Sequence, residues 1–256
     1  MWYLIRSYIK FLLKSTNQHG VHSPFVFNLV TQVFYGKSEQ KIRDQFLAYK
    51  KQLEIDETTI HVTDFGAGSR VFASNQRKVK QIAKNAGISV KRALLLHRLI
   101  QHLKIKNSIE LGTSLGLSTA AMALNNNNQI TTIEGCPETA KRANQAFKTH
   151  HLNNITLIND DFLKALSTIK NQTFDLIYID GNHQKEATIQ YFELLLSHIH
   201  NNSLIIFDDI YWSKGMTEAW AYICDHPKVT VSIDTFYWGF VFFRKEQRKE
   251  HFTIRI

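Results

Sequence analysis

Cysteine is nearly absent from this 256-residue chain, which contains only Cys136 and Cys224. Two cysteines are too few for a disulfide framework, and they lack the spacing of a structural zinc site. Proline is also scarce, at 3 residues against 11 glycines, and 44% of the residues are hydrophobic. This composition excludes collagen and a disordered chain, and it indicates a folded globular protein in a reducing compartment.

Long apolar runs are also lacking. The sequence has no stretch near the roughly 18 apolar residues that a membrane-spanning helix requires. Its apolar start at residues 2–5 is interrupted by Arg6, Lys10 and Lys14, so it does not resemble the core of a signal peptide. Both observations favour a cytoplasmic protein without a transmembrane segment.

Acidic residues are few in the first part of the chain. Residues 1–106 hold 18 Lys+Arg and 6 Asp+Glu, a net charge of +12, whereas residues 107–256 hold 13 and 16, a net charge of −3. The total of +9 therefore comes from the first part. A basic segment of this kind favours an anionic partner or substrate.

The basic part is expected to be mostly helical. Apolar residues at helical spacing, with Arg6, Lys10 and Lys14 at i, i+4, predict an amphipathic helix with a basic stripe over 2–15. Ser23 and Pro24 suit the start of a second helix, because serine caps helices and proline fits their first turn. Helices are therefore expected over 25–34, 40–56, 76–87 and 90–103.

From Ser108 the pattern changes to short apolar runs that alternate with helix-like stretches. Strands are predicted at 108–111, 130–133, 155–158, 174–179 and 203–207, and helices at 118–124, 138–150, 162–169, 185–199 and 215–224. Two further strands, 229–233 and 236–243, are only two residues apart and predict a hairpin. The expected fold is α/β: a Rossmann-like, doubly wound, mostly parallel seven-stranded sheet with a C-terminal antiparallel hairpin. We expect a helical appendage at 1–89 and the main domain at 90–256.

Ligands of a doubly wound sheet bind at the carboxyl ends of its strands. After the first strand, Gly112 and Gly116 open a helix, and a glycine there lets the backbone approach a ligand closely. Glu134 ends the second strand 22 residues past Gly112, near the spacing at which an acid accepts hydrogen bonds from a ribose. Asp160 and Asp161 follow the third strand. Each alone could be a helix cap or a solvated carboxylate, but the ordered set predicts a cofactor site.

Two other interpretations of glycine motifs are less favoured. A nicotinamide enzyme needs Gly-x-Gly-x-x-Gly to hold a pyrophosphate, and 112–116 does not supply it. The segment 61–68 also looks like an acidic-glycine cofactor loop, but 70–88 lacks the strand and acid that should follow it. We interpret Asp64–Gly68 as a turn that folds over the active site.

Residues 90–245 resemble class I S-adenosylmethionine-dependent methyltransferases. The residues that carry the resemblance are Glu110-Leu-Gly-Thr-Ser-Leu-Gly116, Thr132-Ile-Glu134, Asp160-Asp161, Phe174-Asp-Leu-Ile-Tyr-Ile-Asp-Gly-Asn-His183, Leu204-Ile-Ile-Phe-Asp-Asp209 and the terminal hairpin. The resemblance implies that the glycine loop holds the methionine part of the cofactor, that Glu134 holds the ribose and that Asp161 lies near the adenine. The cofactor-binding residues implied are Glu110, Gly112, Thr113, Ser114, Gly116, Ser118, Glu134, Asp161 and Asp180.

Within that group the chain is similar to metal-dependent O-methyltransferases of the catechol and macrocin types. Asp180, Asp208 and Asp209 match the metal-binding acids of those enzymes. Three converging carboxylates would repel one another unless a hard cation such as Mg²⁺ lay among them, and the cation would activate an acceptor hydroxyl. His183 stands where the macrocin type has histidine, and with Asp180 it is predicted to be catalytic, as the base for the hydroxyl proton.

The resemblance thus implies methyl transfer to the hydroxyl oxygen of a small acceptor, and the basic first part of the chain favours an anionic one. Alternatives are an RNA or tRNA acceptor held by the basic part, and a membrane-surface or partner-binding protein with a vestigial cofactor site. The first helix would otherwise pack as a lid or in a homodimer. Tyr211 and Trp212 are candidates for an aromatic wall of the acceptor pocket, which the segments 19–24 and 64–70 are expected to shape.

Overall fold

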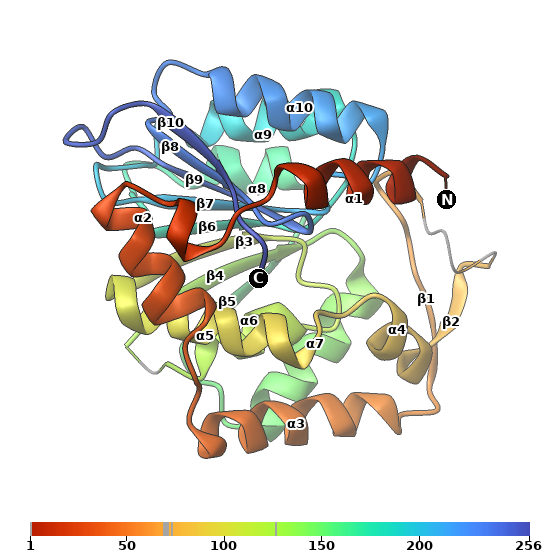
Figure 1. Cartoon of the computed structure of the whole chain (residues 1–256). Coiled ribbons are helices and arrows are strands. Elements are labelled where there is room, and N and C mark those ends of the chain that lie inside the picture. The colour runs from red at the N-terminus through yellow and green to blue at the C-terminus, as the bar shows by residue number, and fades with distance from the viewer. Residues whose placement is uncertain (1, 69–71, 73, 126) are drawn as a thin grey trace. The chain divides into compact units, whose positions relative to one another are not determined.

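The chain forms two compact units, coloured along the sequence in Figure 1. The computed structural model describes residues 2–68, 72, 74–125 and 127–256. One unit is Gly36–Lys170, and the other joins Met1–Tyr35 to Asn171–Ile256. Each unit therefore combines helices from the expected 1–89 appendage with strands from 90–256. The expected functional boundary at residue 89 stays a prediction.

A parallel sheet forms the centre of the unit 36–170. Its strands are β3 (Asn107–Leu111), β4 (Gln129–Glu134) and β5 (Ile155–Asn159), in that order. The helices that follow them are α6 (Leu117–Ala123), α7 (Pro137–Thr149) and α8 (Phe162–Thr168). Parallel neighbours need crossover connections, which the βα alternation of the sequence supplies. The carboxyl ends of the three strands consequently meet at one edge of the sheet.

Helices from the basic part of the chain complete this unit. They are α3 (Gln40–Glu54), α4 (Val79–Asn85) and α5 (Val90–Leu103), with a two-stranded antiparallel sheet of β1 (Thr59–His61) and β2 (Gln76–Lys78). The buried Tyr49 of α3 donates its hydroxyl hydrogen to the Leu115 carbonyl oxygen at 2.8 Å. This bond ties α3 to the loop after β3.

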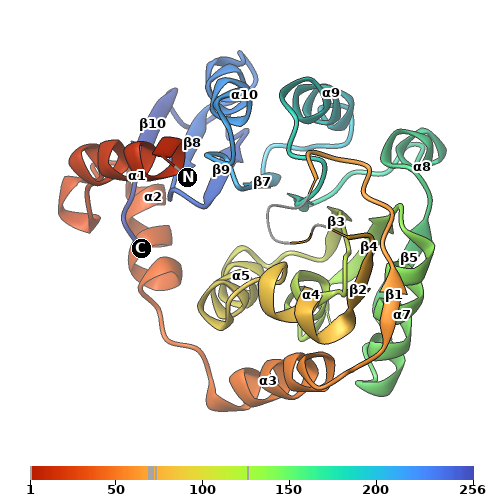
Figure 2. The same ribbon diagram turned by 90° about the vertical axis from the view of Figure 1, so that its right-hand side faces the viewer.

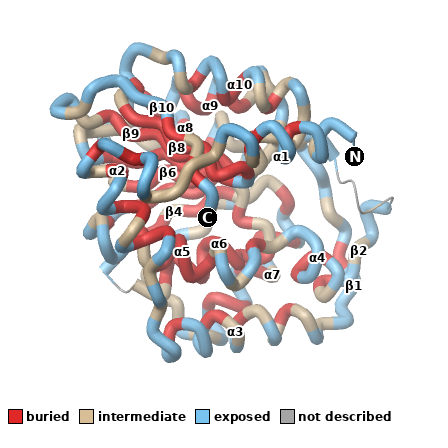
Figure 3. The backbone as a smooth tube through the Cα atoms, in the orientation of Figure 1, coloured by how far each residue is buried: buried red, intermediate tan, exposed pale blue. Residues whose placement is uncertain are grey.

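The sheet of the other unit has the order β10-β8-β9-β7-β6. Its strands are β6 (Leu176–Ile179), β7 (Leu204–Asp208), β8 (Val231–Asp234), β9 (Trp238–Phe242) and β10 (Glu250–Thr253). β9 runs antiparallel to β7 and β8, whereas β6 with β7 and β8 with β10 are parallel pairs. Every residue of β6, β7, β8 and β9 is buried (Figure 3).

Helices from both ends of the chain pack on this sheet. They are α9 (Lys185–Leu195), α10 (Lys214–Asp225), α1 (Trp2–Lys14) and α2 (Pro24–Leu29), with a 3₁₀ turn η1 (Gln18–Gly20) and a π-helical turn η2 (Val30–Phe34). Figure 2 shows α1 near β8 and β10. The Ser23 hydroxyl oxygen accepts a hydrogen bond from the Val26 amide, and Pro24 is the first helical residue, so the predicted start of α2 is confirmed.

The Rossmann-like fold class is confirmed, with all seven predicted strands and the terminal hairpin present. Three short strands were not predicted. β10 and β2 are polar and mostly exposed, and β1 has only three residues, so they lack the apolar alternation that marks a strand in sequence. The segment predicted as a helix over 76–87 accordingly begins as β2 and is helical only in α4. Among the described residues, no helix has the length and apolar character needed to cross a membrane.

Gly239→Ala is expected to lower the free energy of unfolding by about 1–3 kcal/mol, because overpacking strains a filled core. A Cβ at Gly239 on β9 would lie 2.5 Å from the buried Trp220 ring, which also packs on Phe207. Urea unfolding of the variant measures the loss. The matched control is Gly215→Ala on α10, where the new Cβ would meet its nearest neighbour, Lys185, at 3.3 Å. Equal stability of the two variants would contradict this packing account.

Candidate active site

The loop between β3 and α6 turns sharply. Gly112 and Gly116 have φ angles of 104° and 76°, and Ser114 between them has a φ of 49°. A side chain on Gly116 would also place a Cβ 2.4 Å from the Phe147 ring. Glycine is therefore required at 116 both by the backbone conformation and by the packing of α7. The loop presents backbone at the carboxyl end of β3, as the sequence predicted.

Glu110, on β3, holds this loop in place through side-chain hydrogen bonds. Its side chain is fully buried, and its two carboxyl oxygens accept hydrogen bonds from the hydroxyls of Ser118 at 2.5 Å, Thr119 at 2.5 Å and Thr132 at 2.6 Å. Burial raises the pKa of Glu110 to about 7 from an ordinary 4.5, and the three hydroxyl bonds oppose that rise. One carboxyl group thus joins β3, α6 and β4.

Three of the predicted cofactor-binding residues support the loop. Glu110, Ser118 and Thr113 are all buried, and the Thr113 hydroxyl shares a hydrogen bond of 2.6 Å with that of Thr132. Their side chains hold the loop in place, and their part in cofactor binding stays a prediction. The sequence did not indicate Thr119, Thr132 or Tyr49 as parts of this support, because nothing in their spacing links them to the glycines.

Glu134, at the end of β4, points its carboxylate at the loop. Its two oxygens accept hydrogen bonds from the Ser114 amide at 2.7 Å and the Cys136 amide at 2.8 Å. Burial raises the pKa of Glu134, the amide bonds lower it, and the nearby Asp64 charge raises it further. Each carboxylate oxygen has a second lone pair for another donor. Glu134 is therefore held in a fixed position with acceptor capacity remaining.

The turn Asp64–Gly68 packs beside this carboxylate. Asp64 accepts a hydrogen bond from the Gly66 amide at 3.0 Å, and Gly68 has a φ of 79°, so the predicted turn is present. The Phe65 ring lies on the backbone of Gly135, where a Cβ would be 2.9 Å from the ring. The turn thus covers the residue that follows Glu134. Arg70, at the end of the segment expected to shape the pocket, lies outside the described residues.

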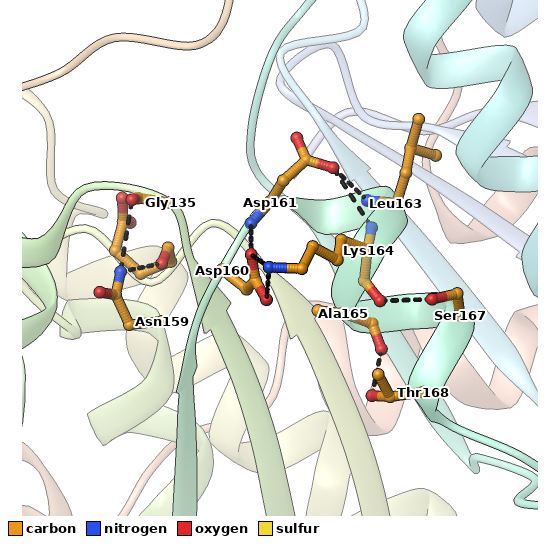
Figure 4. Close-up of polar contacts among 10 residues, drawn as sticks. Gly135, Asn159, Asp160, Asp161, Leu163, Lys164, Ala165, Ser167 and Thr168 are labelled. Carbon is orange, nitrogen blue, oxygen red and sulfur yellow. Dashed lines mark hydrogen bonds and ion pairs between the residues drawn. The ribbon is translucent and has the colours of Figure 1, made fainter.

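Asp161 begins α8 as its cap (Figure 4). Its Oδ1 accepts hydrogen bonds from the amides of Leu163 at 2.9 Å and Lys164 at 3.3 Å. Asp160 forms an ion pair with Lys164, and the Asn159 side-chain amide donates to the Glu134 carbonyl oxygen. Asp161 stays exposed, so capping and the predicted position near an adenine are compatible.

His183 and Asp180 lie in the loop after β6, in the other unit. His183 Nε2 is 3.7 Å from Asp180 Oδ1, and the His183 ring lies 5.7 Å from the Trp212 ring. Asn182 and His183 have φ angles of 68° and 50°, which non-glycine residues adopt at a cost of roughly 1–3 kcal/mol each. The Asn182 side-chain amide donates to the Tyr191 hydroxyl, which helps to hold this strained loop.

The predicted cation site is not formed. Asp208 is buried, and its carboxylate accepts hydrogen bonds from the Tyr178 hydroxyl at 3.4 Å and the Asp209 amide at 2.9 Å. Asp209, directly after the strand, has a left-handed backbone with a φ of 52°. Within the described part of the chain, no three His, Cys, Asp or Glu side chains are grouped so that they could hold a metal ion. Asp180, Asp208 and Asp209 in this arrangement therefore do not fit a divalent cation.

The two aromatic residues after β7, Tyr211 and Trp212, contact different parts of the structure. Trp212 lies against His183, as expected for a wall of the acceptor pocket. Tyr211 instead donates a hydrogen bond to Asp234 Oδ2 at 2.6 Å and stacks on Phe236 at 5.0 Å between ring centroids. Tyr211 therefore belongs to the packing around the end of β8.

Comparisons with known proteins support the predicted resemblance. Residues 109–210 match a family model described as a methyltransferase domain. A putative caffeoyl-CoA O-methyltransferase of Arabidopsis thaliana is 28% identical over 126 residues, which cover 48% of this chain and 54% of the relative. The chain thus spans about half the length of the curated relatives that it matches.

Solved structures share the fold. A putative O-methyltransferase from Klebsiella pneumoniae has a TM-score of 0.57 at 19% identity, covering 81% of this chain and 91% of that one. An O-methyltransferase from Bacillus cereus in complex with SAH has a TM-score of 0.54 at 18% identity, covering 80% and 90%. Residues 109–210 are thus similar to a methyltransferase domain, as the resemblance in the sequence predicted, and solved O-methyltransferases share the fold of the chain.

Glu110→Gln is expected to change how stability depends on pH. Because the folded pKa of Glu110, about 7, lies above its ordinary 4.5, the stability that the protonated side chain contributes is complete below pH 4.5 and is lost as the pH rises through 7. Glutamine does not titrate. Relative to the native chain, the variant should therefore gain up to about 3 kcal/mol between pH 4.5 and pH 8. Urea unfolding at four pH values measures the difference, and a constant difference would contradict the buried, protonated carboxyl.

Proposed function

We propose that the chain is a methyltransferase that uses S-adenosylmethionine to methylate a hydroxyl oxygen of a small, anionic acceptor. The observation that carries the proposal is the position of Glu134, held by the amides of Ser114 and Cys136 beside the glycine loop. A fixed acid at the end of β4 fits a ribose diol, and the loop Gly112–Gly116 lies beside it, where the methionine part would follow. The residues at the carboxyl ends of β3 and β4 therefore fit the cofactor.

When bound, the cofactor supplies an electrophilic methyl group whose bond to sulfur breaks as the new carbon–oxygen bond forms. His183 is proposed to accept the hydroxyl proton of the acceptor, so that the oxygen attacks as the stronger nucleophile. Asp180, 3.7 Å from His183 Nε2, stabilises the protonated imidazole that results. Trp212 holds the His183 ring in position from the other side.

The resemblance also implied a divalent cation. Since the three carboxylates do not gather into a ligand group, no step of this reaction is assigned to a cation, and the proton is assigned to His183 alone. The acceptor class rests on the basic first part of the chain and on the O-methyltransferase relatives. The comparisons favour neither an RNA acceptor nor a membrane-surface protein, and they do not support a homodimer.

Glu134→Gln is expected to raise the dissociation constant of S-adenosylhomocysteine about tenfold, because a hydrogen bond to a charged acceptor is lost. Isothermal titration calorimetry measures the affinity. Glu186→Gln, which removes one negative charge from an exposed position on α9, is the control and should bind as the native chain does. Equal affinities for the native chain and Glu134→Gln would remove Glu134 from the ribose site.

His183→Ala is expected to lower turnover by roughly 10²- to 10⁴-fold, the usual contribution of a general base, while cofactor affinity stays unchanged. Release of S-adenosylhomocysteine is measured against a panel of hydroxylated acceptors that includes caffeoyl-CoA, the compound in the name of the plant relative. His102→Ala changes an exposed histidine on α5 and serves as the control. Undiminished turnover in His183→Ala would exclude the base.

The same assay with a chelator separates the base from a cation. We expect turnover to persist, because the described carboxylates form no group of three metal ligands. Turnover that is abolished by the chelator and restored by Mg²⁺ would show that the carboxylates gather around a cation during the reaction.

A further inference from the structure

A large cavity lies between α1, α10, the edge strand β10 and its neighbour β8, all within one unit. Its volume is about 1090 Å³. The residues around it include neither Asp180, His183 and Trp212 nor the carboxylates that end β7. It therefore forms a compartment separate from the proposed catalytic residues.

α1 is fixed over this cavity at both ends. Near its start, the Tyr3 hydroxyl donates to the Thr217 hydroxyl oxygen of α10 at 2.7 Å. Just past its end, Thr16 pairs with Ile254 beyond β10: the Thr16 amide donates to the Thr253 carbonyl oxygen at 2.9 Å. Midway, the Phe11 ring contacts Phe236 at 5.5 Å between centroids. The helix thus has a defined face over the cavity.

That face carries the basic stripe. Arg6, Lys10 and Lys14 all line the cavity, and an α-helix spaces such residues about 6 Å apart along its axis. Like charges four residues apart disfavour the isolated helix. Among the described residues, the ion pairs within 4.0 Å involve none of the three. The protein thus places three cations along one wall without protein carboxylates to pair them.

The floor is polar, and its acids are already engaged. Asp234 is buried, and its carboxylate accepts hydrogen bonds from the Tyr211 hydroxyl at 2.6 Å and the Phe236 amide at 2.7 Å. Burial raises the pKa of Asp234, and the hydrogen bond from Tyr211 opposes the rise. Ser232 and His251 share a hydrogen bond of 2.8 Å across β8 and β10.

Elsewhere around the cavity, four carboxylates face two cations. The further cations are Lys214 and Lys249, and the carboxylates are Glu218, Asp225, Asp234 and Glu250. Glu218 is held by Lys185 at 2.7 Å, and Lys249 donates to the carbonyl oxygens that end α10. The lining as a whole therefore has a net charge of +1, with three of its five cations on α1 and its four carboxylates on the other walls.

We propose that this cavity binds a small organic molecule with two or more phosphate groups, separately from the methyltransferase reaction. Its phosphate groups lie along Arg6, Lys10 and Lys14. These three cations are spaced about 6 Å apart along the helix, so they match a ligand with several negative charges better than a ligand with one. Its organic body lies toward Trp220 and the Ser232 hydroxyl. The volume is of the size that organic ligands occupy, and it exceeds what an inorganic ion requires.

Calorimetry with a hexose bisphosphate as the probe tests this site on the full chain. The native chain should bind the probe, and the double variant Lys10→Ala, Lys14→Ala should bind it at least about tenfold more weakly, because contacts to the phosphates are lost. Ala221→Trp fills the cavity from an exposed position on α10 without changing any charge, and it should weaken binding to a similar extent. Circular dichroism checks that each variant is folded.

The matched control is the double variant Lys41→Ala, Lys148→Ala, which removes the same charge from exposed positions on α3 and α7. It should bind the probe within twofold of the native chain. No binding by the native chain, or an equal loss in both double variants, would overturn the proposal. An Ala221→Trp chain that binds with native affinity would also overturn it, because the ligand would then lie outside the cavity.

Anionic vesicles of phosphatidylglycerol provide the second arm. The outer face of α1 exposes Trp2 and Leu13, with 86% and 83% of their surface accessible, and a bilayer is the other phosphate source that such a helix fits. Sedimentation with vesicles, without binding of the soluble probe, would reject the cavity site in favour of a membrane-facing helix.

Discussion

The glycine loop depends on the hydrogen bonds that the buried carboxyl group of Glu110 accepts. The donors are hydroxyls on α6 and β4, so one side chain fixes the start of the helix and the neighbouring strand. An unpartnered carboxyl group at this depth would be costly, and three hydroxyl donors supply the compensation. The loop in turn holds the Glu134 carboxylate through the Ser114 amide, and that carboxylate keeps acceptor capacity for a ligand.

The second group of functional residues is held differently. In the loop after β6, consecutive left-handed residues, Asn182 and His183, store local strain. Packing of His183 against Trp212 and the bond from Asn182 to Tyr191 offset part of it. Strain of this kind persists where the surrounding structure determines the position of a side chain, as the proposed proton acceptor would require.

Much of this arrangement was predictable from the sequence, because the buried parallel strands of this chain are short apolar runs with acids and glycines at their ends. The strands, the hairpin and the glycine loop followed from that pattern. The direction of the Glu110 side chain could not be predicted from that pattern. A strand buried on both faces has no polar face toward which a carboxyl group would be expected to point. The left-handed backbone at Asp209, with a φ of 52°, was also not predictable, because residue spacing does not reveal it. The basic stripe was evident, but the cavity beneath it depends on α10 and β10, far along the chain.

The central claim is that the glycine loop and Glu134 hold S-adenosylmethionine. A crystal structure of the chain with S-adenosylhomocysteine tests it most directly. The account predicts that both ribose hydroxyls lie within hydrogen-bond distance of the Glu134 carboxylate and that the methionine part follows the backbone of Gly112–Gly116. A ligand bound elsewhere, with Glu134 still bonded only to the amides of Ser114 and Cys136, would contradict it.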